Sequence, residues 1–222
     1  MFYPFANGQE DIVRDGLVLW LDAGDRTSYP GGGTTWSDLS LGGNNGTLIN
    51  GPTFNSLNGG SIVFDGVDDY GILGTITQIA PGTGDFTFEF WINPTNWSNL
   101  YMPLFTTTIT DGLWIGKIES NFVLRTYNVA DDLQTTTFPT VNTWTAVVVR
   151  RSGTTANIYY NNISIVSGTV TRNYVQGDSE ISRDGTTNVF NGKMSNIKYY
   201  NKALSQSEIA QNFNATRGRF GI

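Results

Sequence analysis

The clearest alternation of apolar and polar positions in the chain lies at residues 85–94. Phe86, Phe88 and Phe90 occupy every second position, and this period of two is typical of a β-strand with two different faces. Pro94 cannot donate a ladder hydrogen bond, so it marks the end of the strand. Because the phenylalanine face must belong to a core, we expect this strand to lie mid-sheet, with a neighbour on each edge and a second sheet beneath it.

Further strands are predicted by short apolar runs that alternate with turns rich in glycine, asparagine and aspartate. They cover residues 16–22, 47–49, 61–64, 70–72, 103–107, 113–118, 121–126, 143–150, 157–160, 163–166 and 193–200. The connection at residues 65–69 predicts a hairpin with an acidic tip. Asn161 and Asn162 suit the positive φ angles of a second tight hairpin.

One helix is predicted near the C-terminus. Ser205 and Glu208 have the spacing of a capping box, and Leu204 and Ile209 flank it as a hydrophobic staple. Ile209 and Phe213 lie four residues apart and so share one helical face. We therefore expect a short helix of about two turns that docks on the edge of the sandwich.

These elements together predict an all-β fold: a two-sheet antiparallel β-sandwich of the jelly-roll type with one short C-terminal helix. No linker, change of composition or repeat divides the chain, so we expect one domain over residues 16–222. An N-terminal arm, residues 1–15, precedes it and carries Phe2, Tyr3 and Phe5. Two interpretations of the arm remain open: a frayed terminus, or a segment that packs on another subunit.

Composition narrows the possible functions. The 222 residues carry a net charge of −6 and contain no histidine and no cysteine. The missing side chains exclude disulfides, thiolate or histidine catalysis and metal sites built from these ligands. An acidic chain without a basic run disfavours nucleic acid and anionic membranes as partners, and no apolar run is long enough to span a membrane. The N-terminus lacks the pattern of a signal peptide, so we expect the chain to fold in the cytosol.

Five stretches form an ordered set along the chain. They are Gly60-Ser-Ile-Val-Phe-Asp-Gly-Val-Asp-Asp-Tyr70, Phe86-Thr-Phe-Glu-Phe-Trp-Ile-Asn-Pro94, Trp144-Thr-Ala-Val-Val-Val, Ile158-Tyr-Tyr-Asn-Asn and Phe190-Asn-Gly-Lys-Met-Ser-Asn-Ile-Lys-Tyr-Tyr-Asn-Lys-Ala-Leu-Ser. Together they resemble the concanavalin A-like lectin/glucanase superfamily in its laminin G-like (LamG-like) jelly-roll branch, over roughly residues 16–213. The end of the chain, Asn212-Phe-Asn-Ala-Thr-Arg-Gly-Arg-Phe-Gly-Ile222, is similar to the ending of such modules in virion proteins of tailed phages, notably cyanophages.

The resemblance raises the question of catalysis, because the superfamily includes glucanases. Those enzymes carry a Glu-x-Asp-x-(x)-Glu strand, in which one carboxylate attacks and the other protonates. The corresponding strand here holds Glu89 alone among aromatic residues. Since one glutamate lacks the second carboxylate that hydrolysis needs, we expect a protein without enzymatic activity, with a glycoside hydrolase as the less favoured alternative.

Sugar binding would need exposed aromatic rings and hydrogen-bonding side chains. Trp97, Tyr101 and Trp114 lie on or near predicted loops, where their rings could stack on sugars, and Arg125 or Asn128 could bond hydroxyl groups. For any one of these residues, ordinary packing is the alternative, because tryptophan is highly buried on average.

Asp65, Asp68 and Asp69 are the candidate metal ligands. Clustered carboxylates suit Ca²⁺, and the resemblance supports this because LamG-like modules often bind calcium. The alternative, which we favour, is a turn shaped by Asp65 and Gly66, in which Asp68 and Asp69 bond to loop amides.

The resemblance implies a structural virion protein, either a head-decoration or a fibre component, whose lectin-like sandwich contacts host-surface glycans. A phage protein needs no export signal, since lysis releases it. The expected partners are other virion proteins, reached through the N-terminal arm, and further copies of the chain in a homo-oligomer, for which we expect a trimer. The alternative is a free carbohydrate-binding module or adhesin.

Overall fold

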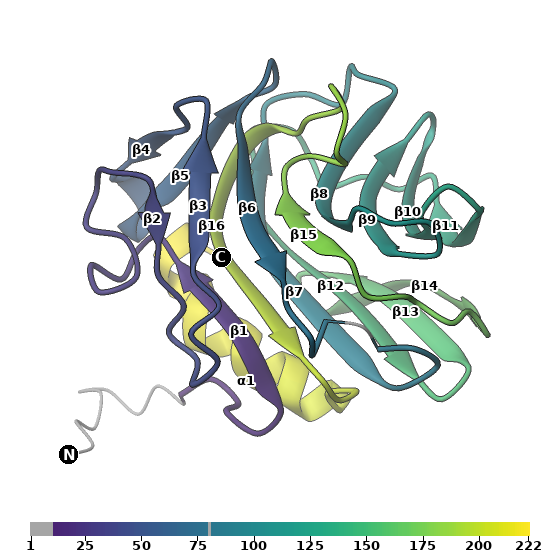
Figure 1. Cartoon of the computed structure of the whole chain (residues 1–222). Helices are drawn as coiled ribbons and strands as arrows, with labels where there is room; N and C mark the ends of the chain where they lie inside the picture. The colour runs from purple at the N-terminus through teal and green to yellow at the C-terminus, as the bar shows by residue number, and fades with distance from the viewer. Residues whose placement is uncertain (1–10, 80) are drawn as a thin grey trace.

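Two antiparallel sheets pack face to face, as the alternation of apolar residues predicts (Figure 1). The computed structural model describes residues 11–79 and 81–222. The predicted fold class is confirmed: an antiparallel β-sandwich with one short C-terminal helix. Of the N-terminal arm, residues 1–10 lie outside the described part of the chain.

The first sheet, sheet A, contains the strand on which the prediction centred. In spatial order it comprises β14 (Ile163–Thr169), β13 (Thr155–Tyr160), β12 (Thr145–Ser152), β7 (Phe86–Pro94), β16 (Asn191–Tyr200), β5 (Ser61–Asp65) and β4 (Thr53–Asn55), and β1 (Leu17–Asp22) also pairs with β16. Because β7 lies between β12 and β16, its expected place in the middle of a sheet is confirmed.

The second sheet, sheet B, holds the strands of the middle of the chain. In spatial order it comprises β11 (Ala130–Thr135), β10 (Asn121–Thr126), β9 (Leu113–Ile118), β8 (Tyr101–Thr107), β15 (Asp178–Ile181), β6 (Tyr70–Thr75), β3 (Gly46–Ile49) and β2 (Thr35–Trp36). The strands β2, β4, β11 and β15 were not predicted. β2, β4 and β15 have only two to four residues, and β11 is mostly polar, so pairing with a neighbour rather than their own alternation defines these strands.

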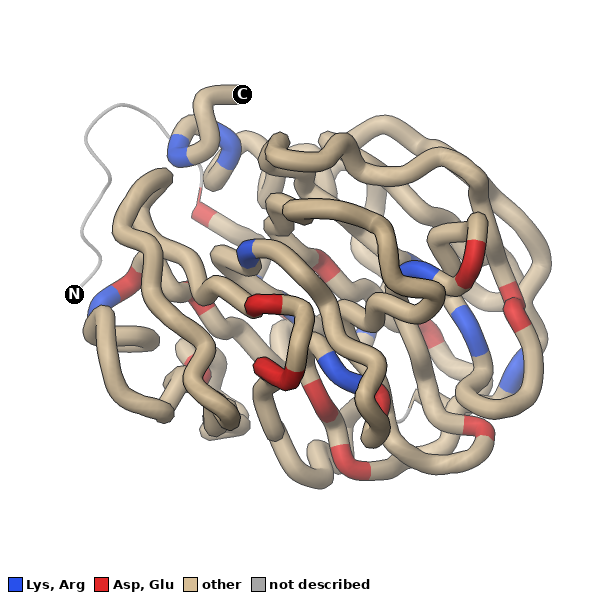
Figure 2. Tube along the Cα trace, turned by 90° about the horizontal axis from the view of Figure 1, so that it is seen from above, with Lys and Arg blue, Asp and Glu red and all other residues tan. Residues whose placement is uncertain are grey.

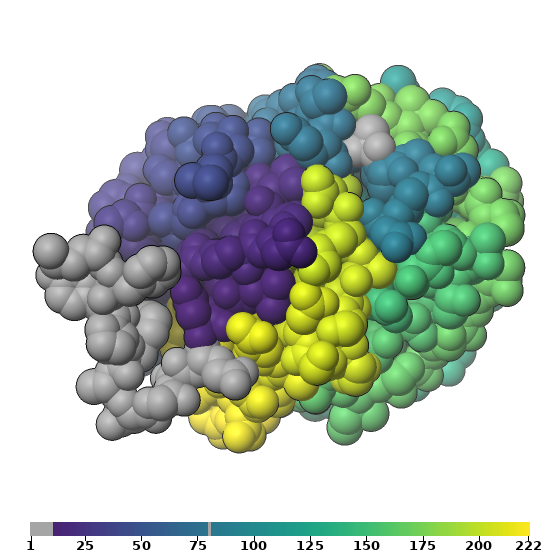
Figure 3. Space-filling model, turned by 90° about the horizontal axis from the view of Figure 1, so that it is seen from below, coloured from purple at the N-terminus to yellow at the C-terminus, as the bar shows by residue number. Residues whose placement is uncertain are grey.

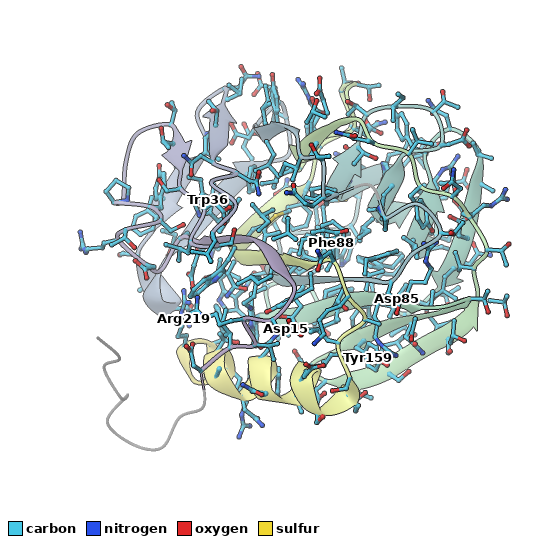
Figure 4. All side chains as sticks on the ribbon, turned by 60° about the horizontal axis from the view of Figure 1, so that its bottom comes forward. Asp15, Trp36, Asp85, Phe88, Tyr159 and Arg219 are labelled. Carbon is cyan, nitrogen blue, oxygen red and sulfur yellow. The ribbon has the colours of Figure 1, made fainter. Side chains whose placement is uncertain are left out.

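The phenylalanine face of β7 forms the centre of the core between the sheets. Phe86, Phe88 and Phe90 are at most 1% exposed. The ring of Phe88, labelled near the middle of Figure 4, lies 4.6 Å from the rings of both Phe105 in sheet B and Tyr199 in sheet A. Full burial of one such side chain contributes about 1.5–3 kcal/mol, so these contacts hold the two layers together.

The predicted hairpin across residues 65–69 is wrong. β5 pairs with β4 and β16 in sheet A, whereas β6 pairs with β3 and β15 in sheet B. The connection therefore crosses from one sheet to the other. A tight turn can have the same local sequence whether the two strands that it joins pair with each other or belong to different sheets. The second predicted hairpin is confirmed, because β13 pairs with β14 and Asn161 and Asn162 have φ angles of 49° and 66°.

The helix α1 (Gln206–Arg217) begins at the predicted capping box. The Ser205 hydroxyl accepts a hydrogen bond from the Glu208 N–H, and the Glu208 carboxylate accepts one from the Ser205 N–H at 2.7 Å. The helix has 12 residues, more than the predicted two turns. It also lies across the outer face of sheet A rather than on an edge (Figure 1), because Ile209 joins a buried apolar cluster with residues of β12, β13 and β16.

Two single-turn helices complete the described chain: η1 (Leu57–Gly59) and, directly after α1, η2 (Gly218–Phe220). No helix among the described residues combines the length and the apolar character needed to cross a membrane.

Candidate functional site

Three of the residues predicted to contact sugar lie in sheet B. Trp114 of β9 and Arg125 of β10 are direct cross-strand partners, and Tyr101 of β8 lies opposite Ile118 of β9. The outer face of these strands is therefore where the structure brings the predicted residues closest together. Their exposure decides which of them a sugar could reach.

Trp114 requires a correction. It is 1% exposed and packs in a small apolar cluster with Ile118, Val123 and Tyr127. The hydroxyl of Tyr127 donates to the backbone carbonyl of Asp184 at 2.7 Å, which ties this cluster to the loop after β15. The indole is covered on its outer side, so a sugar cannot stack on it, and packing describes its role.

Trp97 also has a packing role. Its indole N–H donates to the carbonyl of Pro139 at 2.8 Å. Its ring lies 5.5–6.3 Å from the rings of Phe122, Phe138 and Phe190. The residue is half-buried and closes one part of the main core. Aromatic packing, the alternative to sugar stacking, therefore accounts for its buried part, and sugar contact at its exposed part stays a prediction.

Tyr101 and Arg125 remain accessible. Tyr101 is 36% exposed. The Arg125 guanidinium forms an ion pair with Asp131 at 2.8 Å, and Asn128, with a φ of 59°, occupies the turn between β10 and β11. Sugar contact at these positions stays a prediction.

The acidic turn between β5 and β6 brings its three carboxylates together. Asp65, Asp68 and Asp69 offer oxygen atoms that all lie within 4.8 Å of one another. Asp65 Oδ1 accepts from the Val67 N–H at 2.8 Å, and Asp69 Oδ2 accepts from the Asp65 N–H at 3.1 Å. Burial raises the pKa of Asp69, and the neighbouring carboxylates of Asp65 and Asp68 raise it further. The bonds of Asp65 and Asp69 match the turn interpretation, whereas Asp68 takes part through its backbone N–H, which donates to Asp65 Oδ1 at 3.4 Å. The all-oxygen ligand set also fits Ca²⁺, so calcium binding stays a prediction.

The one candidate for a catalytic carboxylate is buried beneath α1. Glu89 is 6% exposed. It accepts hydrogen bonds from Lys198 Nζ at 3.3 Å and from Asn212 Nδ2 at 3.0 Å on each carboxylate oxygen. Lys198 and Asn212 are each 1% exposed. The carboxylate therefore fastens the helix to sheet A.

This buried cluster was missed because its members lie 109 and 123 positions apart in the chain. A usable signal was present, however. Lys198 interrupts an apolar strand, and Asn212 follows Ile209 by three positions on the packed side of the helix. Polar side chains at positions that periodicity assigns to a buried face need buried partners.

The C-terminal segment, residues 217–222, packs on strands of sheet A. The Arg219 guanidinium donates to both carboxylate oxygens of Asp22, at 3.0 and 2.7 Å. The ring of Phe220 stacks on Trp91 with 4.1 Å between centroids. Figure 4 labels Arg219 beside the end of α1 next to β1. This segment thus docks on its own chain.

Comparison with known proteins decides the family. A family model described as the concanavalin A-like lectin/glucanases superfamily matches residues 65–210. The chain belongs to the concanavalin A-like superfamily. No curated protein matches its sequence.

Solved structures with the concanavalin A-like fold superpose on most of the chain at low identity. Domain 4 of AbnA, a GH43 extracellular arabinanase from Geobacillus stearothermophilus solved in complex with arabinotriose, is 14% identical, with a TM-score of 0.70 over 91% of this chain and 100% of that one. The binding domain of Paraclostridial Mosquitocidal Protein 1 is 18% identical, with a TM-score of 0.72 over 91% and 52%. Trypanosoma rangeli sialidase in complex with sialic acid is 16% identical, with a TM-score of 0.67 over 92% and 33%.

The chain thus corresponds to all of the arabinanase domain, about half of the second structure and about a third of the third. At such identities these likenesses show the fold alone.

Proposed function

We propose that this chain is a non-enzymatic structural protein of a virion, a head-decoration or fibre component, whose lectin-like sandwich contacts glycans on the host surface. The observation that carries the non-enzymatic part is the burial of Glu89 in an ion pair with Lys198 beneath α1.

Glycoside hydrolysis needs two carboxyl groups that flank the bond to be cleaved. In this chain both oxygens of Glu89 are held by Asn212, and one is also held by Lys198. A substrate could approach Glu89 only if α1 left sheet A, which would expose Ile209 and the apolar cluster under the helix. The position that resembles the catalytic strand of glucanases therefore serves packing.

The virion setting is supported by the resemblance of residues 212–222 to the ending of tailed-phage modules. Two of the similar structures are, by their own descriptions, a domain of an extracellular enzyme and the binding domain of a mosquitocidal protein. Figure 2 shows acidic and basic residues interspersed over the described chain, which supports partners other than nucleic acid.

A free carbohydrate-binding module or adhesin is the second candidate. One observation favours it: the AbnA domain that matches over its whole length was solved in complex with arabinotriose. In that case glycan recognition would be the main task of the chain, and assembly into particles would have no part in it.

Mass spectrometry distinguishes the virion protein from the free carbohydrate-binding module or adhesin. The sample is virus particles purified by density from a culture that expresses the chain. We expect the chain in the particle fraction, in a constant ratio to the major capsid protein. Its recovery only as free protein, outside the particles, would contradict the virion role and favour the adhesin.

A further inference from the structure

A groove of about 580 Å³ opens on the side of sheet A where the start of the described chain meets its end. Trp20 of β1 lines it, together with Ile12 on one side and Arg219 of η2 on another. Figure 3 shows this face of the molecule, with the purple N-terminal segments directly beside the yellow C-terminal ones. Ligand pockets typically measure about 300–1,000 Å³, so the groove is large enough for several sugar units.

The lining of the groove carries the carboxylates of Asp11, Asp22 and Asp25 and the guanidinium groups of Arg26 and Arg219. Asp11 forms an ion pair with Arg14 at 3.3 Å. Asp22 and Arg219 neutralise each other in a two-pronged ion pair. Asp25 and Arg26 follow each other in the next loop, where Asp25 Oδ1 accepts hydrogen bonds from the backbone and hydroxyl of Thr27. The exposed Arg26 has neither a hydrogen bond nor an ion pair within the described chain. Its guanidinium is therefore a free donor at the rim of the groove.

A second hollow of about 310 Å³ adjoins the first. The two share Gly24, Arg26 and Gly59, so Arg26 borders both. The partly exposed ring of Phe54 lines the second hollow and packs on the buried ring of Tyr29, 5.6 Å away. An elongated ligand could thus pass Arg26 and contact Trp20 on one side of it and Phe54 on the other.

The lining is held in place before any ligand arrives. A Cβ added at Gly24 would lie 1.9 Å from Arg219 Nη2 and 2.6 Å from the Gly59 carbonyl oxygen, so these segments pack as closely as a glycine allows. Arg219 Nη2 also donates to Ser195 Oγ of β16 at 3.0 Å. A preformed site loses less conformational entropy when a ligand binds, because its side chains and loops are already ordered.

We propose that this groove is a binding site for a neutral oligosaccharide. The inference rests on the proposed function, since it assigns the place where the chain contacts glycans. Sugar hydroxyls both donate and accept hydrogen bonds, and the Asp25 carboxylate with the Arg26 guanidinium supplies one acceptor and one donor group. The partly exposed Trp20 adds an aromatic ring, of which one face is covered by the Arg14 guanidinium at 4.4 Å from the ring centroid. Because three carboxylates and two guanidinium groups line it, the groove has no surplus of positive charge for an anionic sugar.

The test uses the indole N–H signals of the full-length protein in two-dimensional NMR. Arabinotriose, laminaritriose and cellotriose serve as neutral probes and sialyllactose as the anionic probe, each at millimolar concentration. Trp20→Phe and Trp114→Phe assign two indole signals. We expect at least one neutral trisaccharide to shift the Trp20 signal and leave the buried Trp114 signal unchanged.

Two arginine variants complete the test. Arg26→Ala should weaken the binding of that trisaccharide about tenfold or more, as expected for the loss of a hydrogen bond from a charged donor. Arg172→Ala, the same change at an exposed arginine that does not line the groove, should bind as the unaltered protein does.

A neutral sugar could bind without shifting the Trp20 signal and with equal affinity for the unaltered protein and Arg26→Ala. That result would overturn the groove assignment but leave the proposed glycan contact standing. Binding of sialyllactose alone would overturn the neutral class. If none of the four sugars bound, both the groove assignment and the glycan contact would fail, while the virion role would still be decided by the particle fractions.

Discussion

At the scale of single residues, one buried carboxylate links three segments of the chain. Glu89 of β7 is bonded to Lys198 of β16 and to Asn212 of α1, and the Asn212 side-chain oxygen accepts from the Val13 N–H at 2.8 Å. Burying two charges carries a large desolvation cost, and removing one partner leaves the other uncompensated. The cluster therefore makes α1 and the segment before β1 depend on Glu89.

We predict that Glu89→Gln lowers the free energy of unfolding by about 3–5 kcal/mol, because Lys198 would keep a buried charge without its partner. Urea denaturation measures the change. Glu119→Gln alters an exposed glutamate and should stay within about 0.5 kcal/mol of the unaltered protein. A loss from Glu89→Gln no larger than that of the control would show that the pair is not buried in solution.

Arg151 shows the limit of sequence reasoning at this scale. The alternation of β12 places it on the same face as Val147 and Val149, yet a charged side chain predicts exposure. Arg151 is 0% exposed and donates to the backbone carbonyls of Gly84 at 2.9 Å and Arg172 at 2.7 Å. Its acceptors are backbone atoms of distant loops, which carry no side-chain signal.

At the scale of elements, local sequence patterns predicted that a helix and an acidic turn are present. They did not predict where these two elements lie in the fold. The capping box and the acidic turn are short-range patterns. The placement of α1 over sheet A and the separation of β5 from β6 depend on pairings between residues far apart. In the same way, burial removed Trp114 from the predicted sugar site, because packing partners decide exposure.

Asn212 offers a test of how α1 holds the N-terminal segment. We predict that Asn212→Ala lowers the free energy of unfolding by roughly 1–3 kcal/mol or more, because it leaves buried groups unsatisfied. Hydrogen exchange at the Val13 amide should accelerate in this variant, since that N–H loses its acceptor. Asn214→Ala changes an exposed asparagine of the same helix and should leave Val13 exchange unaltered. Unchanged exchange in Asn212→Ala would contradict the anchoring role.

The turn between β5 and β6 gives a pH- and calcium-dependent prediction. The pKa of Asp69 is raised in the folded chain. The folded state therefore binds this proton more tightly than the unfolded state, and ionisation above that pKa costs stability. Without calcium, Asp69→Asn should raise stability at neutral pH, by about 1 kcal/mol or less.

Ionisation of Asp69 costs stability without calcium, but a bound Ca²⁺ ion would stabilise the ionised form of all three carboxylates. We expect millimolar Ca²⁺ to raise the melting temperature of the unaltered protein by mass action and EDTA to lower it again. The response should disappear in Asp69→Asn. Calorimetry that finds no shift in the unaltered protein would remove the calcium site and leave the turn interpretation.

At the scale of the whole molecule, the superfamily and the two-sheet sandwich were predictable because they follow from periodicity and an ordered set of motifs. Assembly is a separate question, and the arm residues expected to reach a partner, Phe2, Tyr3 and Phe5, lie outside the described residues. Ile12 and Val13, by contrast, are buried on their own chain.

We predict a homo-oligomer, a trimer, that depends on the arm. Light scattering coupled to gel filtration should give three chain masses for the full chain and one for a variant without residues 2–10. The shortened variant should still fold, because the deletion spares the contact between Val13 and Asn212. Equal masses for the two forms would contradict an oligomer built through the arm.

The central claim is that this lectin-like sandwich contacts glycans without cleaving them. The most direct measurement follows one sample of laminaritriose or arabinotriose with the protein by proton NMR over a day. The account predicts broadened sugar signals, which report binding, and no growth of new reducing-end signals. New reducing ends that form with the unaltered protein and disappear in a folded Glu89→Gln variant would contradict it.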